Sequence, residues 1–236
     1  MDVTVLMMSY KRRENLPAIL TALAEQTCQP KEIIVINNEG DVTLEIEDVT
    51  VINCDRNLGP YIRPAIGLLV GTSHVMCHDD DVICGPRVIE NFLYWAERLP
   101  PGSILGYEGR QVIAINDRPY TRGSWEFVGS LLKPREIDLV YAKCMLIEPG
   151  VFRHHWNVYH QIEDPQMDED IYTTLANPGK NYLIPIMPGA ELTPLDEHGL
   201  ALSKRDTYWE DRDQIANDVL AVMGRKEWVE GAPRLR

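Results

Sequence analysis

The sequence predicts an α/β protein whose mostly parallel sheet is covered by helices on both faces. The first observation is a set of four short apolar segments, at residues 3–8, 33–36, 49–53 and 73–78. Each has the length of a strand and is apolar throughout, which is typical of strands buried on both faces. The second observation is that two segments with helical spacing of apolar residues, at 15–26 and before residue 69, separate these strands in the chain.

A polar loop follows each of the strands that are expected at the centre of the sheet. The loops are residues 9–13 after the first strand, 37–40 after the second and 79–81 after the fourth. Open parallel sheets bind ligands beyond the carboxyl ends of their strands. We therefore expect a single cleft that all three loops contact.

The second half of the chain predicts further elements with less regular spacing. A helix is expected at 86–99, where Pro100-Pro101-Gly102 ends it, and a surface helix at 208–224. Strands or strand-like pieces are expected, in chain order, at 104–107, 111–115, 137–147 and 182–185. The aromatic and basic segment 118–125 is expected to form a loop or hairpin, and the tail 230–236 to fray.

Length, charge and cysteine content narrow the class of protein. With 236 residues and 44% apolar residues, the chain can bury a full core, and we expect one domain. Its formal net charge of −13 excludes a general binder of phosphate backbones. Five scattered cysteines and the absence of an apolar run of about 18 residues predict a soluble, cytoplasmic protein with reduced thiols.

The run Asp79-Asp80-Asp81, directly after an apolar strand, is the clearest candidate for chemistry. Carboxylates collected at such a place need a cation, and Mn²⁺ or Mg²⁺ prefers oxygen ligands. Side chains alternate along an extended segment, so Asp79 and Asp81 are expected on one side. The alternatives are a solvated acidic turn or a helix cap, although Asp81 lies five positions before Pro86.

The histidines His154, His155 and His160 raise the possibility of a zinc site. No cysteine and no second histidine pair stands at ligand spacing from them, which disfavours zinc. We expect these histidines to line or flank the side of the cleft opposite the aspartates.

These motifs, in this order, resemble the nucleotide-sugar-dependent glycosyltransferases of the GT-A fold, most of all the large inverting (family 2-like) group. The resemblance runs from about residue 3 to residue 198. Ser9, Tyr10 and Arg12 are similar to the family's nucleoside-binding loop. Asn37-Asn38-Glu39-Gly40 takes the place of an Asp-Asp-Gly-Ser stretch, which implies that Asn38 contacts the base. The two amides weaken any inference that the base is uracil.

The resemblance also implies roles for residues further along the chain. Asn57 and Arg63 look like the family's Asn-x-Gly segment and the helix after it, and Asp79 and Asp80 would contact the nucleotide sugar. Metal ligands would be Asp81, Asp79 and, in a later loop, His198. Asp168-Glu169-Asp170 is similar to the family's Glu-Asp motif, so the implied catalytic residues are Asp170, as base, and Glu169.

The implied fold is therefore one GT-A domain over residues 1–236. Residues 1–100 would bind the nucleotide sugar, 101–205 would form the acceptor and catalytic half, and 206–236 a helix and tail. The implied activity is metal-dependent transfer of a sugar, a hexose or a pentose, from a nucleoside diphosphate sugar to an acceptor hydroxyl. The acceptor stays open between a glycan, a small molecule, a protein and a modified nucleic-acid base, and no membrane partner is expected.

Three alternatives remain at this point. A retaining, exostosin-like transferase on the same fold would use Asp170 to orient the acceptor. A nucleotidyltransferase would have a glycine-rich phosphate loop after the first strand, whereas residues 9–13 contain no glycine. A catalytically silent nucleotide or sugar-binding module is supported by Asn37 and Asn38, and the complete set of Asp79, Asp81 and Asp170 argues against it.

Overall fold

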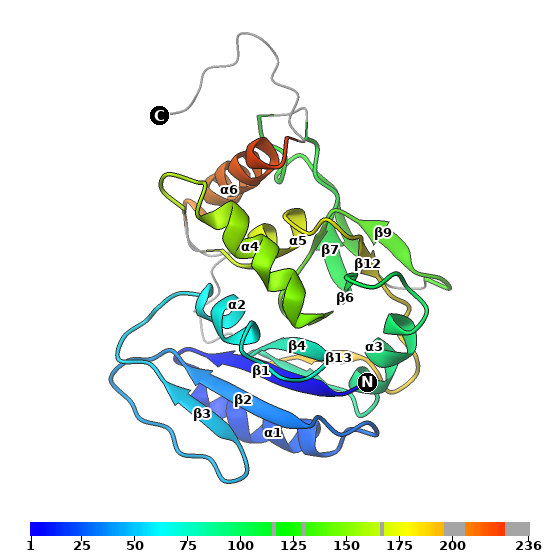
Figure 1. Ribbon diagram of the computed structural model, residues 1–236. Coiled ribbons are helices and arrows are strands. Elements are labelled where there is room, and N and C mark those ends of the chain that lie inside the picture. Colours follow the sequence, from blue (N-terminus) through cyan, green and yellow to red (C-terminus); the bar gives the residue numbers. More distant parts are fainter. Residues whose placement is uncertain (115–116, 129–130, 166–167, 196–205, 225–236) are drawn as a thin grey trace.

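Eight strands form the main sheet of the computed structural model, which describes residues 1–114, 117–128, 131–165, 168–195 and 206–224 (Figure 1). Four parallel strands lie in the order β3-β2-β1-β4, with bounds Thr50–Asn53, Glu32–Asn37, Val3–Ser9 and His74–Asp79. They confirm the four apolar strands predicted from the sequence. With helices on both sides of this half of the sheet, the α/β fold class is confirmed as well.

The rest of the sheet continues beside β4 as β11 (Cys144–Ile147), β6 (Ile104–Gly106), β12 (Asn181–Leu183) and β9 (Arg135–Ile137). Here β11 runs antiparallel to both of its neighbours. A three-stranded sheet holds β10 (Leu139–Val140), β7 (Glu108–Arg110) and β8 (Trp125–Phe127), and a two-stranded sheet pairs β13 (Leu192–Pro194) with β5 (Val82–Cys84).

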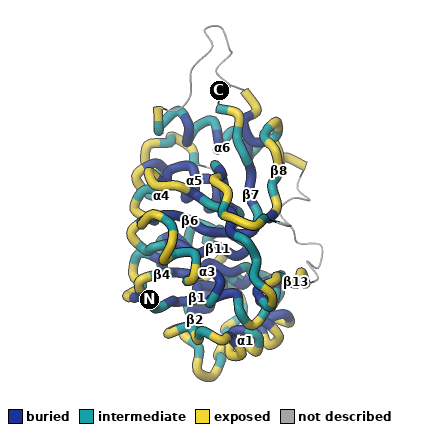
Figure 2. The backbone as a smooth tube through the Cα atoms, turned by 90° about the vertical axis from the view of Figure 1, so that its right-hand side faces the viewer, coloured by how far each residue is buried: buried dark blue, intermediate teal, exposed yellow. Residues whose placement is uncertain are grey.

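Helices cover the sheet and form a second apolar core. The helix α1 (Leu16–Ala24) lies on one side of β1 to β3, and α2 (Ile62–Gly67) and α4 (Phe152–Tyr159) lie on the other (Figure 1). The helix α5 (Asp170–Leu175) packs against both α4 and α6 (Tyr208–Val222). The remaining helical elements are α3 (Val88–Ala96), η1 (Arg13–Asn15) and η2 (Pro149–Val151). Figure 2 shows the central strands buried and α1 exposed along its outer face.

The order of the strands positions the ligand-binding edge. Going along the chain, strands are added on one side of β1 as β2 and β3 and then on the other side as β4. This reversal opens a crevice beyond the carboxyl ends of β1 and β4. Asp79 is the last residue of β4, and Asp80 and Asp81 follow it at that point, so the predicted position of the acidic run at the end of a strand is confirmed.

Two predicted strands are wrong. Residues 137–147 do not form one strand but parts of β9, β10 and β11, because the chain leaves the main sheet after Ile137. The carboxylate of Asp138 there accepts a hydrogen bond from the Val112 amide at 2.8 Å. Residues 111–114 lie outside any strand, since pairing of β7 ends at Arg110, whose guanidinium binds the carbonyls of Tyr120 and Gly123.

Two further expectations about burial are corrected. The third strand, β3, is the edge of the main sheet and is exposed at both ends. The last helix, α6, is present as predicted but is not a surface helix. The helix packs against α5, and its buried residues are Arg212, Asp213, Ile215, Ala216, Val219 and Leu220.

We predict that Gly67→Ala destabilises the protein by about 1 to 2 kcal/mol. A Cβ at Gly67 would overlap the ring of Phe152, which is fully buried where α2 meets α4. Such overpacking costs about 1 to 3 kcal/mol, and the better helix propensity of alanine returns less than about 1 kcal/mol. Thermal unfolding should show a midpoint lowered by several degrees.

The matched control is Gly71→Ala, because a Cβ at Gly71 meets no atom within 4 Å. This variant should unfold at the wild-type temperature. Equal midpoints for the two variants would show that α2 and α4 are not packed as described.

Candidate active site

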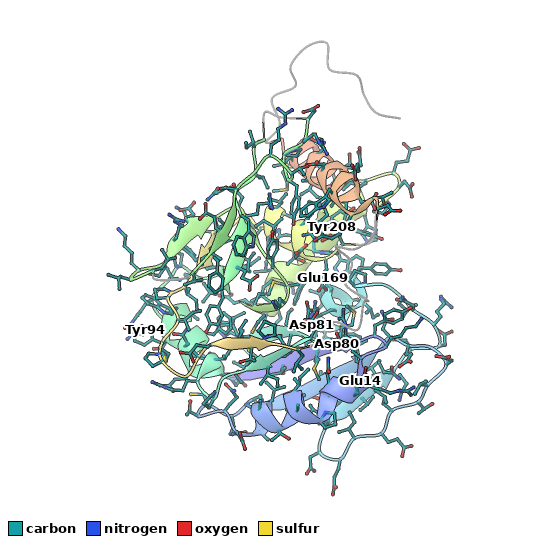
Figure 3. All side chains as sticks on the ribbon, turned by 180° about the vertical axis from the view of Figure 1, so that it is seen from behind. Glu14, Asp80, Asp81, Tyr94, Glu169 and Tyr208 are labelled. Carbon is teal, nitrogen blue, oxygen red and sulfur yellow. The ribbon has the colours of Figure 1, made fainter. Side chains whose placement is uncertain are left out.

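A cavity of about 590 Å³ lies beyond the carboxyl ends of β1 and β4. One wall comes from the loops after β1, β2 and β4 and from α2. The opposite wall comes from β7, the 118–125 segment, the start of α5 and α6. In Figure 3, Asp80 and Asp81 lie at the end of β4, and Glu169 and Tyr208 lie on the side of α5 and α6.

The loop after β1 is held by Asp80. Its carboxylate accepts hydrogen bonds from the Tyr10 amide and from Arg12 Nη1, both at 2.7 Å, and its carbonyl accepts one from Asn15 at 2.9 Å. Tyr10, Arg12 and Asp80 line the cavity, whereas Ser9, which is 2% exposed, does not. Asp80 therefore shapes the wall on which the sequence places the nucleoside.

The amide of Asn38 builds the neighbouring loop. Its Nδ2 donates to Asn57 Oδ1 at 2.9 Å, and its Oδ1 accepts from the Leu58 amide at 2.8 Å. Gly59, at φ 77°, has the backbone conformation that glycine adopts without strain. Asn38 and Asn57 both line the cavity, but the polar atoms of Asn38 already bind the protein.

Arg63 connects the two walls of the cavity. The residue is 1% exposed, and its guanidinium donates to the His78 carbonyl at 3.0 Å and to Asp79 Oδ1 at 2.8 Å. The same guanidinium pairs with Glu169, which lies 106 positions later in the sequence. Because burial of a lone guanidinium is costly, Arg63 and its two carboxylates stabilise one another.

Among the described residues, Asp81 and Glu169 each have a buried carboxylate oxygen without a hydrogen-bond partner, and that of Asp81 lies at the end of β4. This oxygen is Asp81 Oδ1, and Oδ2 of the same carboxylate lies 3.3 Å from Arg12 Nη1. Burial and the charge of Asp79 raise the pKa of Asp81 to about 6. Both features fit a position that a cation would occupy.

A divalent metal suits these carboxylates. The described residues contain no group of three or more histidine, cysteine or acidic side chains arranged to hold a metal by themselves. Mg²⁺ and Mn²⁺ are commonly bound through one or two carboxylates, with waters and substrate phosphates completing the shell. Asp79 and Asp81 could supply those carboxylates. The expected third ligand, His198, lies outside the described residues.

The second acidic cluster is held by Arg212, which the sequence reasoning missed. Arg212 Nη1 lies 2.9 Å from Asp168 Oδ2, and Nη2 lies 2.7 Å from Asp170 Oδ1. The signal was present in the sequence, because Arg212 stands on the apolar stripe of α6 between Tyr208 and Ile215. An arginine on such a stripe needs buried acidic partners.

The pKa values of the two aspartates of this cluster are shifted in opposite directions. Burial and the nearby Asp170 raise the pKa of Asp168 well above its usual range, although Arg212 acts against this. Burial also disfavours the charge of Asp170, but Arg212 and hydrogen bonds, including one from Asp168, outweigh it and lower its pKa. The two shifts run in opposite directions, so Asp168 is the member of the pair that retains a proton more readily.

Aromatic rings line the part of the cavity nearest α6. They are Tyr120, Trp125, Tyr141, Tyr208 and Trp209. His154, His155 and His160 are not among the lining residues, so the expectation that they line the cleft is wrong. His155 is buried and pairs with Thr173 at 2.9 Å, and burial lowers its pKa to about 3.

Comparison with known proteins identifies the family. Residues 4–156 match the model of glycosyl transferase family 2. The chain belongs to glycosyl transferase family 2. This confirms the resemblance to GT-A glycosyltransferases that the motifs carried.

One relative is the uncharacterized glycosyltransferase YwdF of Bacillus subtilis (strain 168). It is 27% identical over 89 residues, which are 34% of this chain and 33% of that protein. The chain thus spans about a third of the length of that relative. The segment matched by family 2 includes Arg63 and Asp79 to Asp81, whereas Asp168 to Asp170 and α6 follow it. Within the described part of this family 2 chain, no helix has the length and apolarity to span a membrane.

We predict that Asp81→Asn stabilises the metal-free protein at pH 8. The folded state holds the Asp81 proton up to about pH 6, whereas the unfolded chain releases it near the usual value of 3.8. Stability is therefore lost as the pH rises from about 4 to about 6, and the full penalty, up to about 3 kcal/mol, persists above that window. Thermal unfolding in EDTA should show a higher midpoint for Asp81→Asn at pH 8 and nearly equal midpoints at pH 4.

The control for this comparison is Asp55→Asn, since the side chain of Asp55 is 78% exposed. Its midpoint should follow the wild type at both pH values. A midpoint of Asp81→Asn at or below the wild type at pH 8 would show that burial of the Asp81 charge does not destabilise the folded protein.

Proposed function

We propose that this protein transfers a sugar from a nucleoside diphosphate sugar to an acceptor hydroxyl, with metal dependence and with inversion at the anomeric carbon. Membership of glycosyl transferase family 2 supports glycosyl transfer in general. The finer statement rests on one observation: a single cavity is lined by Asp81, whose Oδ1 has no hydrogen-bond partner among the described residues, and by Asp170, whose pKa is lowered.

The donor half of the proposal uses the wall formed by the loops after β1, β2 and β4. Tyr10 and Asn57 would flank the nucleoside, and Asp79 and Asp81 would hold Mn²⁺ or Mg²⁺. A bound divalent cation offsets the negative charge that develops on the leaving diphosphate. Arg12, which already neutralises Asp80, keeps this acidic wall compatible with a phosphate ligand.

Asp170 is the proposed general base. It would accept the proton of the acceptor hydroxyl as that oxygen bonds to the anomeric carbon and the nucleoside diphosphate leaves. Its lowered pKa keeps it ionised, and its 7% exposure limits competition from water. Glu169, the other acid of the motif, pairs with Arg63 and would fix that arginine between the walls.

The amides of Asn37 and Asn38 favour a second candidate, a binding module without transfer activity. The side chains of Asn37 and Asn38 both hydrogen-bond within their loops, and neither is acidic. They therefore lack the carboxylate that contacts the base in the family pattern. Such a module would still bind a nucleotide. A retaining transferase would use Asp170 to orient the acceptor instead of deprotonating it, and the anomer of the product separates it from the proposal.

Nucleotide binding should depend on metal and on Asp81. We predict that one nucleoside diphosphate, from a panel with different bases, raises the thermal unfolding midpoint with Mn²⁺ and not with EDTA. At a hundredfold excess over Kd the gain is about 2.7 kcal/mol, which is readily measured. Asp81→Ala should lose this gain. A panel in which no nucleotide stabilises the wild type would contradict the donor site.

Transfer should depend on Asp170. We predict that Asp170→Asn lowers kcat by about 10² to 10⁴-fold, which is the usual contribution of a positioned base, with an unchanged KM for the donor. Release of nucleoside diphosphate measures the rate, and NMR of the product gives the anomer. Wild-type kcat in Asp170→Asn would remove the base from the proposal. Nucleotide binding without any transfer would support the silent module.

A further inference from the structure

We propose that Arg212 is a positioning residue for this reaction, because its guanidinium bridges Asp168 and Asp170 and holds the carboxylate of Asp170 in place in the cavity. This inference rests on the proposed function, in which Asp170 acts on the acceptor. It adds a residue of α6, and α6 lies after the segment that matches family 2.

The geometry of Arg212 is that of a fork with one branch on each carboxylate. Nη1 reaches Asp168 at 2.9 Å and Nη2 reaches Asp170 at 2.7 Å, so the planar guanidinium sets the relative orientation of the two acids. All three residues line the cavity and are at most 7% exposed. A lysine ammonium at the same place has no planar fork of donors, so it could not hold the two carboxylates in one fixed relative orientation.

Aromatic rings restrict the guanidinium from the remaining sides. Its Cζ lies 4.6 Å from the centroid of Tyr120, 5.3 Å from that of Tyr208 and 5.9 Å from that of Tyr141. These rings attract the cation and exclude water from it. The guanidinium is therefore held by two carboxylates and three aromatic rings. Its charged hydrogen bond to Asp170 restricts the orientation of that carboxylate in turn.

The neighbouring Asp213 indicates that the fold does not need Arg212 as the anchor of α6. Asp213 Oδ1 accepts hydrogen bonds from the amides of Tyr120 and Thr121, at 2.9 and 2.8 Å, and so ties α6 to the 118–121 segment. Asp213 is, like Arg212, a buried ionisable residue of α6, but it does not line the cavity. It therefore provides a matched control.

The charged and titratable groups around Asp170 come from several elements. His155 of α4, which packs on α5, bonds to Thr173 instead of Asp170. The groups that act on Asp170, or that its charge acts on, are Arg212 and Tyr208 from α6, Asp168 from its own segment, Tyr120 and, from α2, Arg63. Arg212 is the cation in direct contact with it, and an opposite charge this close shifts a carboxyl pKa by about 1 to 3 units.

The test is a titration of Asp170 followed by ¹³C NMR of its side-chain carboxyl, in the wild type, Arg212→Met, Arg212→Lys and Asp213→Asn. The signal is assigned by its loss in Asp170→Asn. We expect Arg212→Met to raise the midpoint of the Asp170 titration by about 1 to 3 units, because the adjacent positive charge is gone. The acidic limb of the pH–kcat profile, measured by nucleoside diphosphate release, should move upward by the same amount.

Arg212→Lys covers the case in which Arg212→Met does not fold. Lysine keeps the charge, so the titration should stay closer to the wild type, while the loss of the fork lowers kcat at least tenfold with an unchanged donor KM. Asp213→Asn should lower the unfolding midpoint and leave the Asp170 titration unchanged. An Asp213→Asn variant that moves the titration as far as Arg212→Met does would overturn the proposal.

Failure of this inference differs from failure of the proposed function. If Asp170→Asn is inactive but neither Arg212 variant moves the titration or lowers kcat, the positioning role alone is wrong. If Asp170→Asn keeps wild-type transfer, the base is wrong, and with it the role of Arg212, even where the titration shifts.

Discussion

Three arginines each bridge two carboxylates around the cavity, and the structure depends on this compensation. Arg12 contacts Asp80 and Asp81, Arg63 contacts Asp79 and Glu169, and Arg212 contacts Asp168 and Asp170. Six acids against three arginines leave a formal charge of 3 − 6 = −3, or −2 when Asp168 carries a proton. Two carboxylate oxygens, Asp81 Oδ1 and Glu169 Oε2, have no partner in the described part of the chain, and that of Asp81 lies at the end of β4. A divalent cation would offset the negative charge there.

The same bridges bring distant parts of the chain together. Arg63 of α2 links the end of β4 to the start of α5, and Arg212 of α6 returns to the acids at the start of α5. The half of the chain that carries the parallel strands β1 to β4 and the half that carries the proposed base therefore meet through buried charge. Such contacts cost desolvation and specify geometry more than they add stability. An acidic cavity held in this way retains its shape while keeping one carboxylate available.

The sequence predicted the parts of the fold that depend on local pattern. Apolar runs of strand length identified β1 to β4, and a polar loop at the end of a strand identified Asp79 to Asp81 as part of the site. The sequence did not predict where the chain changes sheets within residues 137–147, because the segments on either side of each change are all apolar. The change after Ile137 depends on the hydrogen bond that Asp138 accepts from the amide of Val112, 26 positions earlier in the chain. Arg212 was missed because its partners lie more than 40 positions away, and helical periodicity alone reads a charged position as exposed.

The account centres on a metal and a nucleoside diphosphate bound at the end of β4. The most direct measurement is a crystal structure with Mn²⁺ and the stabilising nucleoside diphosphate, using the anomalous signal of manganese to locate the ion. The account predicts the ion against Asp81, bridging to the diphosphate, with the nucleoside beside Tyr10 and Asn57 and with Arg212 still on Asp170. An ion bound away from Asp79 and Asp81, or a nucleotide seated between α5 and α6, would contradict it.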